Sequence, residues 1–485
     1  MIYDVAIAGA GVIGGMIARE LTKYNLSVLI LEKENDVAMG ASKANSGIIH
    51  GGFDPVPNTL KAKLNVKGVP LLYKTAKELN VPFKNNGSII VAFNKEEELV
   101  LEELYKRGLK NGVSDMEILS GEEAQKLEHN LSKEVTKALV VKSAGIICPY
   151  SLTIAAVGNA MDNGAELKRN FEILKIEKTN NNDEDLFKIT STTAEDVFSR
   201  YFINCAGGFA DKIAEMLDDN FFTVIPRVGE YMLLDKSEGK TVEHTIFQVP
   251  TKNGKGILVT PTVHGNLLLG PTAEEVYKYT DTKTTQKGLN TVKSLAKRSV
   301  PGINFKEVIT SFSGVRASEE NGDFILQKSK NVKGLIHAAA IDSPGLSSCV
   351  AIAEYVVNIL KEILQEDGKE LIENKSYNGK RKDVNAFKKM TVEEKNLFIK
   401  NNPSFGKIVC RCEVVSEGEI LEALRINPKA LDLDGVKRRV RAGMGRCQGG
   451  FCTPYILGLI AEELKIPLTE VSKKGKNSKI VYKEL

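Results

Sequence analysis

Several common features are missing from this sequence. No apolar run approaches the ~20 residues that a helix needs to span a bilayer. The net charge is only +4, and no basic stripe is interleaved with aromatics, so we expect no nucleic-acid partner. The first apolar segment begins almost at Met1, which leaves no room for a signal peptide. We therefore expect a cytoplasmic protein, which could still dock at the inner face of the cell membrane through a partner.

Cysteine is scarce as well, and its distribution is uneven. Seven cysteines are an odd number, which argues against the disulfide framework of a secreted domain. Four of them form two close pairs near the C-terminal end, Cys410-Arg-Cys412 and Cys447-Gln-Gly-Gly-Phe-Cys452. Four thiolates can meet at one metal centre, and zinc and an iron–sulfur cluster are the two candidates. The other three lie in apolar runs and are expected to be buried, inert thiols: Cys148, Cys205 and Cys349.

The chain is long enough for more than one hydrophobic core. Its 485 residues suggest two or three domains, and 42% hydrophobic with 26% charged residues is the composition of a globular protein. Residues 366–405 are charged and rich in Lys and Asn, which indicates a linker with some helix. The Lys-rich stretch from Lys473 to Lys479 is expected to be a frayed tail.

A dinucleotide site is predicted at the start of the chain. Residues 2–8 form a short apolar run typical of a buried strand, and three glycines follow it before a helical stretch. Gly9 permits a tight turn, Gly11 lets the backbone approach a pyrophosphate, and Gly14 allows close helix–strand packing. The N-terminus of the helix offers free N–H groups and a positive dipole to the phosphates.

An acidic residue completes this βαβ unit. Ser27 to Leu31 is predicted to be the second buried strand, and it ends in Glu32. A carboxylate at that place can bind the ribose hydroxyls, and it argues against a 2′-phosphate. The position of the glycines after a strand, with the acid in place, favours a nucleotide site over a merely structural turn.

Periodicity and turn residues predict the remaining elements. Helices are expected at residues 58–80, 95–110, 151–164 and 346–364. Strands are expected at 88–93, 200–205, 231–234, 256–260, 266–269 and 334–340, with a hairpin at 171–189 that has a polar tip at 180–183.

Three further segments are not found in a simple NAD domain. They are the small-residue loop 40–47, a second strand-to-glycine turn at 204–208, and Asp342-Ser-Pro-Gly345, which leads into a late helix. Together they resemble the D-amino-acid-oxidase superfamily of FAD enzymes over roughly residues 1–365. The resemblance implies non-covalent FAD, with its ADP half on the first βαβ unit and its flavin ring under the 40–50 loop and the 343–348 helix start. The FAD-binding positions implied are Gly9, Gly11, Gly14, Glu32, Lys33, Ser42, Asn45, Ser46, Ile173, Ala206, Gly207, Gly345, Leu346 and Ser347.

Two motifs indicate the substrate side. Ser46-Gly-Ile-Ile-His50-Gly-Gly52 and Ser313-Gly-Val-Arg316 resemble glycerol-3-phosphate dehydrogenases within that superfamily. The resemblance implies that His50 takes the hydroxyl proton and that Arg316 clamps the phosphate or the substrate oxygen. The chemistry agrees, because oxidising a secondary alcohol at a flavin needs proton removal as hydride leaves. Arginine also binds phosphate or carboxylate in a forked geometry.

The substrate itself stays open at this point. Segments 44–48, 229–231 and 343–346 resemble the L-2-hydroxyglutarate dehydrogenase group equally well. Phe53 and Asp54 follow Gly52, where glycerol-3-phosphate enzymes often have an extra arginine. Both substrates are small anionic 2-hydroxy compounds, so the reaction type is the same in either case.

The cysteine-rich end resembles a known cluster domain. Ile408-Val-Cys-Arg-Cys-Glu413 and the stretch from Arg441 to Cys452 are similar to the bacterioferritin-associated-ferredoxin type of [2Fe–2S] domain. That module ends the catalytic subunit of anaerobic glycerol-3-phosphate dehydrogenases, which favours glycerol 3-phosphate. Many members space the last pair as Cys-x2-Cys, whereas this chain has Cys-x4-Cys. The resemblance implies four cluster ligands: Cys410, Cys412, Cys447 and Cys452.

The predicted fold is α/β, with a Rossmann-like FAD-binding domain, an interleaved α+β substrate domain and a small helical four-cysteine domain. The expected boundaries are 1–84, 141–220 and 316–365 for FAD, 85–140 and 221–315 for substrate, 366–405 for the linker and 406–485 for the cluster. The predicted activity is FAD-dependent oxidation of glycerol 3-phosphate, with electrons leaving through the cluster to a partner redox subunit or quinone. The alternatives are an L-2-hydroxyglutarate dehydrogenase, an amine or opine dehydrogenase subunit, and a non-catalytic cluster-carrying subunit.

Overall fold

The first sheet of the molecule is mainly parallel. The computed structural model describes residues 1–181, 184–192, 195–250 and 256–483. Ala8 is level with Asn204 on one side and with Leu31 on the other, so the carboxyl ends of three neighbouring strands meet at one edge. Open parallel sheets bind ligands at that edge. The parallel strands lie in the order β20 (Leu335–Ala339), β12 (Val197–Asn204), β1 (Ile2–Ala8), β2 (Val28–Leu31) and β9 (Glu166–Lys168).

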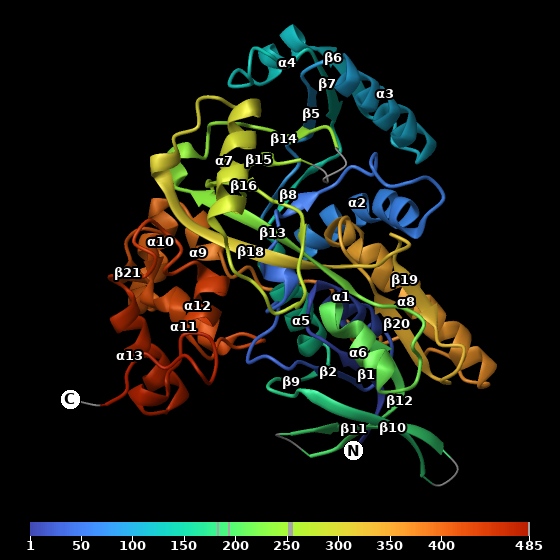
Figure 1. Ribbon diagram of the computed structural model, residues 1–485. Helices are drawn as coiled ribbons and strands as arrows, with labels where there is room; N and C mark the ends of the chain where they lie inside the picture. Colours follow the sequence, from blue (N-terminus) through green and yellow to red (C-terminus); the bar gives the residue numbers. More distant parts are fainter. Residues whose placement is uncertain (182–183, 193–194, 251–255, 484–485) are drawn as a thin grey trace.

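Helices cover one face of this sheet (Figure 1). The central strands are runs of Val, Ile, Leu and Ala buried on both faces, which is the pattern of parallel sheets packed between layers. The opposite face packs on a hairpin that continues the sheet beyond β12 and on a short helix. The covering elements are α1 (Val12–Leu21), α2 (Leu60–Glu78), α5 (Pro149–Asp162) and α8 (Gly345–Glu366) on one side, and β10 (Ile173–Asn181), β11 (Glu184–Ser191) and α6 (Ala210–Glu215) on the other; β19 (Ile325–Lys328) pairs with β20.

A second, mixed sheet lies above the first in Figure 1. Its longest pairing joins β13 (Ile225–Leu234) to β18 (Val308–Ser318), and this ribbon crosses the edge where the parallel strands end. A Cβ at Gly314 would come within 1.8 Å of the carbonyl oxygen of Ala44, so β18 lies directly against the 40–47 loop. The other strands are β5 (Ser88–Ala92), β6 (Met116–Ser120), β7 (Lys137–Val141), β14 (Thr245–Gln248), β15 (Leu258–Pro261), β16 (Leu267–Gly270) and β17 (Glu274–Glu275), covered by α3 (Lys95–Lys110), α4 (Gly121–Leu127) and α7 (Gln286–Ser299).

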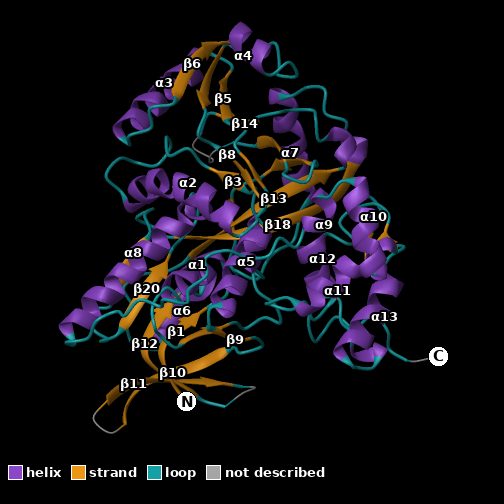
Figure 2. Ribbon diagram, turned by 180° about the vertical axis from the view of Figure 1, so that it is seen from behind, coloured by secondary structure: helices purple, strands orange, loops and turns teal. Residues whose placement is uncertain are grey.

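The C-terminal module has its own small core. Figure 2 shows its helices gathered on one side of the molecule, beside both sheets. Residues 386–405 of the expected linker fold onto this module, because Phe387, Phe398 and Phe405 pack together as three aromatic rings. Its elements are α9 (Ala386–Lys389), α10 (Val392–Asn401), β21 (Ile408–Cys410), β22 (Val415–Ser416), α11 (Glu417–Arg425), α12 (Leu433–Val440) and α13 (Thr453–Leu464); a separate small sheet, β3 (Ile48–Ile49), β8 (Gly145–Ile147) and β4 (Phe83–Lys84), lies between the two large sheets.

Buried charge holds the module to the first sheet. Asp36, in the loop after β2, accepts hydrogen bonds from Arg438 at 2.6 Å and from both terminal nitrogens of Arg439 at 2.8 Å. All three side chains are at most 6% exposed. The pKa of Asp36 is well below its usual range, because the two guanidinium groups outweigh the effect of burial.

The predicted fold class and the principal helices and strands are confirmed, although the domain boundaries stay a prediction. The polar tip of the 171–189 hairpin falls partly on 182–183, outside the described residues. The expected fraying of Lys473 to Lys479 is wrong. Ser472 and Lys479 form an antiparallel bridge, and Asp434 donates its backbone N–H to the carbonyl of Lys473. Asp434 lies 39 residues before Lys473 in the sequence, so local composition could not reveal this contact.

The helices of the described residues are all either too short or too polar to cross a bilayer.

Candidate functional site

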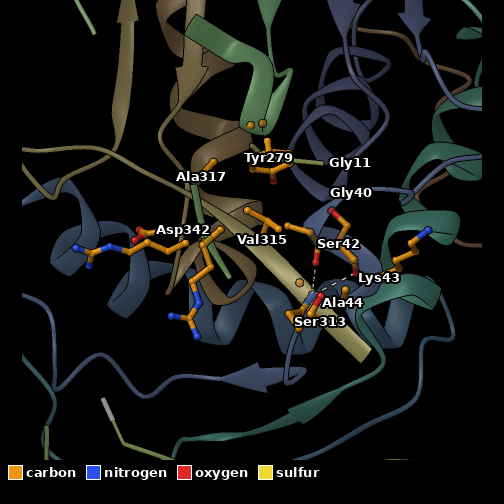
Figure 3. Close-up of a pocket in the computed structure, with 18 of the residues that line it drawn as sticks. Gly11, Gly40, Ser42, Lys43, Ala44, Tyr279, Ser313, Val315, Ala317 and Asp342 are labelled. Atoms are coloured by element: carbon orange, nitrogen blue, oxygen red, sulfur yellow. Dashed lines mark hydrogen bonds between the residues drawn. The ribbon is translucent and has the colours of Figure 1, made fainter. Parts of the chain in front are cut away.

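A cavity of about 1930 Å³ opens between the two sheets, at the carboxyl ends of the parallel strands. The loop after η1 (Ala41–Lys43) forms one wall and β18 the other. Figure 3 shows Ala44 of the loop next to Ser313 of β18. The hydroxyl of Ser313 is buried and has no hydrogen-bond partner among the described residues. A buried polar atom of this kind in a cavity wall is suited to a bound ligand.

The first βαβ turn has the close contacts predicted from its glycines. Gly9 has a φ of +100°, and a Cβ there would meet the carbonyl oxygen of Cys205 at 2.6 Å. A Cβ on Gly14 would meet the carbonyl oxygen of Gly9 at 2.1 Å, so only glycine allows α1 to approach the strand this closely. The turn therefore presents the N-terminus of α1 to the cavity, where phosphates bind.

Glu32 lies at the cavity wall, and each of its two carboxylate oxygens accepts one backbone hydrogen bond. It accepts hydrogen bonds from the N–H groups of Ala10 at 2.8 Å and Glu34 at 2.9 Å. Burial raises the pKa of Glu32 to about 7, although these two N–H groups act to lower it. The carboxyl group is therefore close to its titration point near neutral pH when no ligand is present.

Most of the predicted FAD-binding residues line the cavity, and two do not. Gly14 lies behind the turn, against the strand, as its packing role requires. Ser347 is buried and binds backbone: its hydroxyl accepts from the N–H of His50 at 2.7 Å and donates to the carbonyl of Ile48. The residues that line the cavity are Gly9, Gly11, Glu32, Lys33, Ser42, Asn45, Ser46, Ile173, Ala206, Gly207, Gly345 and Leu346.

The 40–47 loop is fixed by its own hydrogen bonds. Ser42 accepts from the N–H of Val12 at 2.9 Å, which ties the loop to the first residue of α1. Asn45 donates to the carbonyls of Ala41 and Ser42 and accepts from the N–H of Gly47. These hydrogen bonds fix the backbone of the loop against the start of α1. The cavity, the exposed α1 terminus and the Glu32 carboxylate together fit FAD.

His50 lies in the same cavity, on the side of the second sheet. Its Nε2 is 3.2 Å from the hydroxyl of Ser343, and its ring lies 5.8 Å from that of Phe247. The side chain of Asn65 donates to the His50 carbonyl at 2.8 Å. Backbone and ring are therefore both positioned, as a proton-accepting group requires.

Arg316 faces the cavity from β18, where it pairs in register with Arg227 of β13. Tyr231 is buried beside it and stacks on Phe312 at 4.8 Å. Burial raises the pKa of Tyr231, although hydrogen bonds with Arg316 and Ser46 act to lower it. Arg316 and the 46–50 segment are thus brought together, as predicted.

Sequence reasoning missed two of these neighbours as site residues. Tyr231 belongs to the Gly229-Glu-Tyr231 motif and Ser343 to the Ser343-Pro-Gly345 motif. Both motifs were visible in the sequence, but only the fold shows that the two side chains lie beside Arg316 and His50.

The four predicted cluster ligands form two pairs. Cys412 and Cys447 are 3.6 Å apart at the surface, while Cys410 and Cys452 are buried and hydrogen-bonded to each other. No group of three or more Cys, His, Asp or Glu side chains among the described residues surrounds a single point as a one-ion site would. Two pairs suit a two-iron cluster, because four thiolates are shared between the two irons.

Backbone N–H groups surround these thiols. The pKa of Cys410 is lowered to about 5, by a hydrogen bond from Cys452 and by N–H groups of Gly443 and Glu413, against the effect of burial. The pKa of Cys447 is also lowered, because N–H groups such as that of Gly449 outweigh burial. Groups that stabilise thiolates also fit cluster sulfurs. The three other cysteines are buried with raised pKa values, as expected: Cys148, Cys205 and Cys349.

Comparison with known families agrees with both sites. The model of the FAD dependent oxidoreductases matches residues 4–359. The model of the BFD-like [2Fe-2S] binding domain matches residues 408–462, which include all four cysteines. The first match covers the cavity-lining residues as far as Leu346, and the second covers the two thiol pairs.

Individual relatives are similar over most of the chain. A glycerol 3-phosphate dehydrogenase of Caloramator mitchellensis is 46% identical over 480 residues, covering 99% of this chain and 98% of that protein. An L-2-hydroxyglutarate dehydrogenase of Dictyostelium discoideum is 31% identical over 414 residues, covering 74% and 92%. The structure of reduced L-alpha-glycerophosphate oxidase from Mycoplasma pneumoniae with FAD bound superposes with a TM-score of 0.74 and 31% identity, covering 79% of this chain and 98% of that one.

Proposed function

This chain belongs to the family of FAD dependent oxidoreductases and carries a BFD-like [2Fe-2S] domain, and from that premise we propose that it oxidises glycerol 3-phosphate to dihydroxyacetone phosphate. The observation that carries the proposal is the 46% identity to a glycerol 3-phosphate dehydrogenase over 99% of the chain, cluster domain included. In this reaction FAD would accept the hydride and the cluster would pass on single electrons.

In this proposal His50 is the catalytic residue. Its ring lies in the cavity with Nε2 3.2 Å from the hydroxyl of Ser343, and a neutral imidazole has one unprotonated nitrogen that can take the proton of the substrate C2 hydroxyl. Ser343 acts as a positioning residue, since it fixes the rotation of the imidazole ring.

Arg316 is the proposed clamp for the anionic end of the substrate. It enters the cavity from a strand paired along its length with β13, so its backbone is rigid. The hydroxyl of Tyr231 forms a hydrogen bond with the guanidinium group of Arg316 and keeps that group turned toward the cavity. A planar fork of donors suits phosphate or carboxylate oxygens.

The proposed FAD ligands are the residues predicted from the sequence that line the cavity, with Glu32 for the ribose and the N-terminus of α1 for the diphosphate. The proposed cluster ligands are the two cysteine pairs.

We place the link between the two sites at Tyr150. This side chain at the start of α5 donates to the sulfur of Met444 at 3.5 Å and accepts from Arg441 at 3.1 Å. Arg441 also binds Glu413, the neighbour of Cys412, at 2.8 Å. Three residues before Tyr150, the backbone N–H of Ile147 donates to the carbonyl of Gly47, in the 40–47 loop, at 2.8 Å. The two sites are therefore joined by a continuous series of contacts through Tyr150 and Arg441.

From the cluster, we propose, electrons pass to a partner redox subunit or a quinone. Cys412 is exposed and Cys447 partly so, which leaves this edge open to a partner. Such a partner would also account for any association of the protein with the inner face of the cell membrane.

L-2-hydroxyglutarate is the second candidate substrate. The 31% identity to an L-2-hydroxyglutarate dehydrogenase supports it, as does the position after Gly52, where Phe53 is buried and offers no charge for a phosphate. The test is an anaerobic substrate panel with the purified protein. Faster bleaching of the flavin bands by glycerol 3-phosphate supports the first proposal, and faster bleaching by L-2-hydroxyglutarate contradicts it. An imino product from an amine substrate, or a flavin that no substrate reduces, would contradict both.

A further inference from the structure

The C-terminal segment 472–479 reaches the opposite end of the cavity from His50. Lys473 and Lys474 line the cavity together with Asp434, the second residue of α12. They lie on the side of Glu32, Lys33 and Glu34, where the ADP half of FAD is assigned. The cluster domain therefore forms part of the wall of the FAD cavity, although the matched model of the FAD dependent oxidoreductases ends at residue 359.

Several contacts hold the segment in this place. Lys473 pairs with Asp434 at 3.0 Å, and the hydroxyl of Ser478 closes the turn by accepting from the N–H of Lys474 at 2.7 Å. A Cβ on Gly475 would come within 3.1 Å of the side chain of Asn35, so the turn packs against the loop after β2. Asn35 in turn donates to Asp432 at the N-cap of α12.

Two lysines at this mouth have no carboxylate partner among the described residues. They are Lys43 and Lys474. The other two lysines of the mouth do have carboxylate partners: Lys33 lies 3.7 Å from Glu34, and Lys473 is paired with Asp434. Lys43, in contrast, contacts only the sulfur of Met39 at 3.6 Å, a weak acceptor. Lys474 is exposed, with its side chain toward the cavity mouth.

The environment of Lys43 makes an anion favourable there. Burial lowers the pKa of Lys43 to about 8, and the positive charge of Arg438 acts in the same direction. Lys474 also acts to lower it, whereas the carboxylates of Asp434 and Glu34 act in the opposite direction and only partly offset the effect of burial. Lys43 follows Ser42 directly, and Ser42 is bound to the N-terminus of α1, which is the diphosphate end of the site.

We propose that the cluster domain completes the FAD site: Lys474 of its C-terminal turn and Lys43 of the flavin loop bind the FAD diphosphate from two sides and close the ADP end of the cavity. The cluster domain thus has a second role besides carrying electrons, because its docking also determines how tightly FAD is held. The inference concerns FAD binding alone and does not depend on which substrate is oxidised.

The test is a titration of the full-length apoprotein with FAD, followed by protein fluorescence, with the [2Fe–2S] cluster in place. We expect Lys474→Gln to raise the Kd for FAD about three- to fivefold, since a single exposed charge contact contributes up to about 1 kcal/mol. Lys43→Gln should raise it more, about tenfold, because its charge is half-buried. In both variants the Kd should depend less on salt concentration than in the unaltered protein.

Lys476→Gln is the matched control. Lys476 lies on the same turn and is equally exposed, but it does not line the cavity, so its Kd and salt dependence should be unchanged. Free ADP, which carries the diphosphate without the flavin, should bind more weakly to Lys474→Gln by the same factor. A Kd for FAD that is equal in Lys474→Gln and Lys476→Gln would overturn the inference. The FAD titrations contain no substrate, so the inference and the proposed function are tested separately.

Discussion

At the scale of single residues, the sequence allowed the candidate catalytic and substrate-binding residues to be predicted, but not the side chains that hold them in position. The motif around His50 identified the residue, whereas its hydrogen-bond partner Ser343 is 293 positions away. The same holds for Tyr231 beside Arg316, which are joined only because β13 and β18 pair. The sequence gives no distance between such positions, so only the fold can show which polar side chain orients a catalytic one.

Replacing His50 should slow flavin reduction strongly. We expect His50→Gln to lower the rate of bleaching by substrate by about 10²–10⁴-fold, which is the usual contribution of a general base. The rate is measured by anaerobic stopped-flow absorbance. FAD content should be unchanged, which serves as the control for folding. Ser343→Ala should have a smaller effect and shift the pH profile of the rate, and a wild-type rate in His50→Gln would contradict the assignment.

FAD affinity should depend on pH through Glu32. Because its pKa is raised to about 7, the carboxyl group becomes neutral as the pH falls below that value. The ribose hydroxyls donate to the charged form, so the Kd for FAD should rise below pH 7, by up to about tenfold per pH unit. Glu32→Gln should bind FAD more weakly and lose this dependence. Titrations between pH 5.5 and 8.5 that give a constant Kd for the unaltered protein would contradict the role of Glu32.

At the scale of elements, sequence motifs predicted the structure reliably where they consist of glycines in a tight turn or of paired cysteines. The β1–α1–β2 unit was predictable because only glycine at positions 9 and 14 permits the close packing of the helix on the strands. The cluster domain was predictable from the resemblance that its two cysteine motifs carry, whereas their spacing alone left zinc and iron–sulfur open. The order of residues 472–479 was not, since it depends on Asn35 and Asp434. Residues 386–405 likewise fold because three separated phenylalanines meet.

The loop that carries Cys447 should be needed for electron exit but not for substrate oxidation. We expect Cys447→Ser to keep flavin bleaching by substrate within about twofold, while transfer to an external acceptor dye falls at least tenfold, because a two-iron cluster needs all four thiolates. Both rates are measured on the same preparation, together with iron content. Cys349→Ser is the control, since that thiol is buried away from the cluster. Equal loss of both rates in Cys447→Ser would contradict the assignment of flavin reduction and electron exit to two separate sites.

At the scale of the whole molecule, the cluster domain is fixed to the FAD domain by buried charge. Removing Asp36 would leave Arg438 and Arg439 without their carboxylate, and breaking one partner of a buried ion pair costs roughly 3–5 kcal/mol.

Asp36→Asn should therefore lower the thermal unfolding midpoint and weaken FAD binding as well, because the domain that closes the ADP end is loosened. Calorimetry and FAD titration measure the two effects. Glu366→Gln is the control, since its pair with Lys328 is exposed and worth at most about 1 kcal/mol. The pKa of Asp36 is lowered in the fold, so its stabilisation is present above its unfolded pKa and should be lost as the pH falls through its folded value. An unchanged midpoint in Asp36→Asn would contradict this account of docking.

The central claim is that substrate oxidation at FAD and single-electron transfer by the cluster occur in one chain. The most direct measurement is the anaerobic visible spectrum of the purified protein before and after addition of glycerol 3-phosphate. We predict bleaching of the flavin bands together with loss of the cluster absorption. Flavin and cluster bands that are both present but unchanged by glycerol 3-phosphate would contradict the assigned substrate.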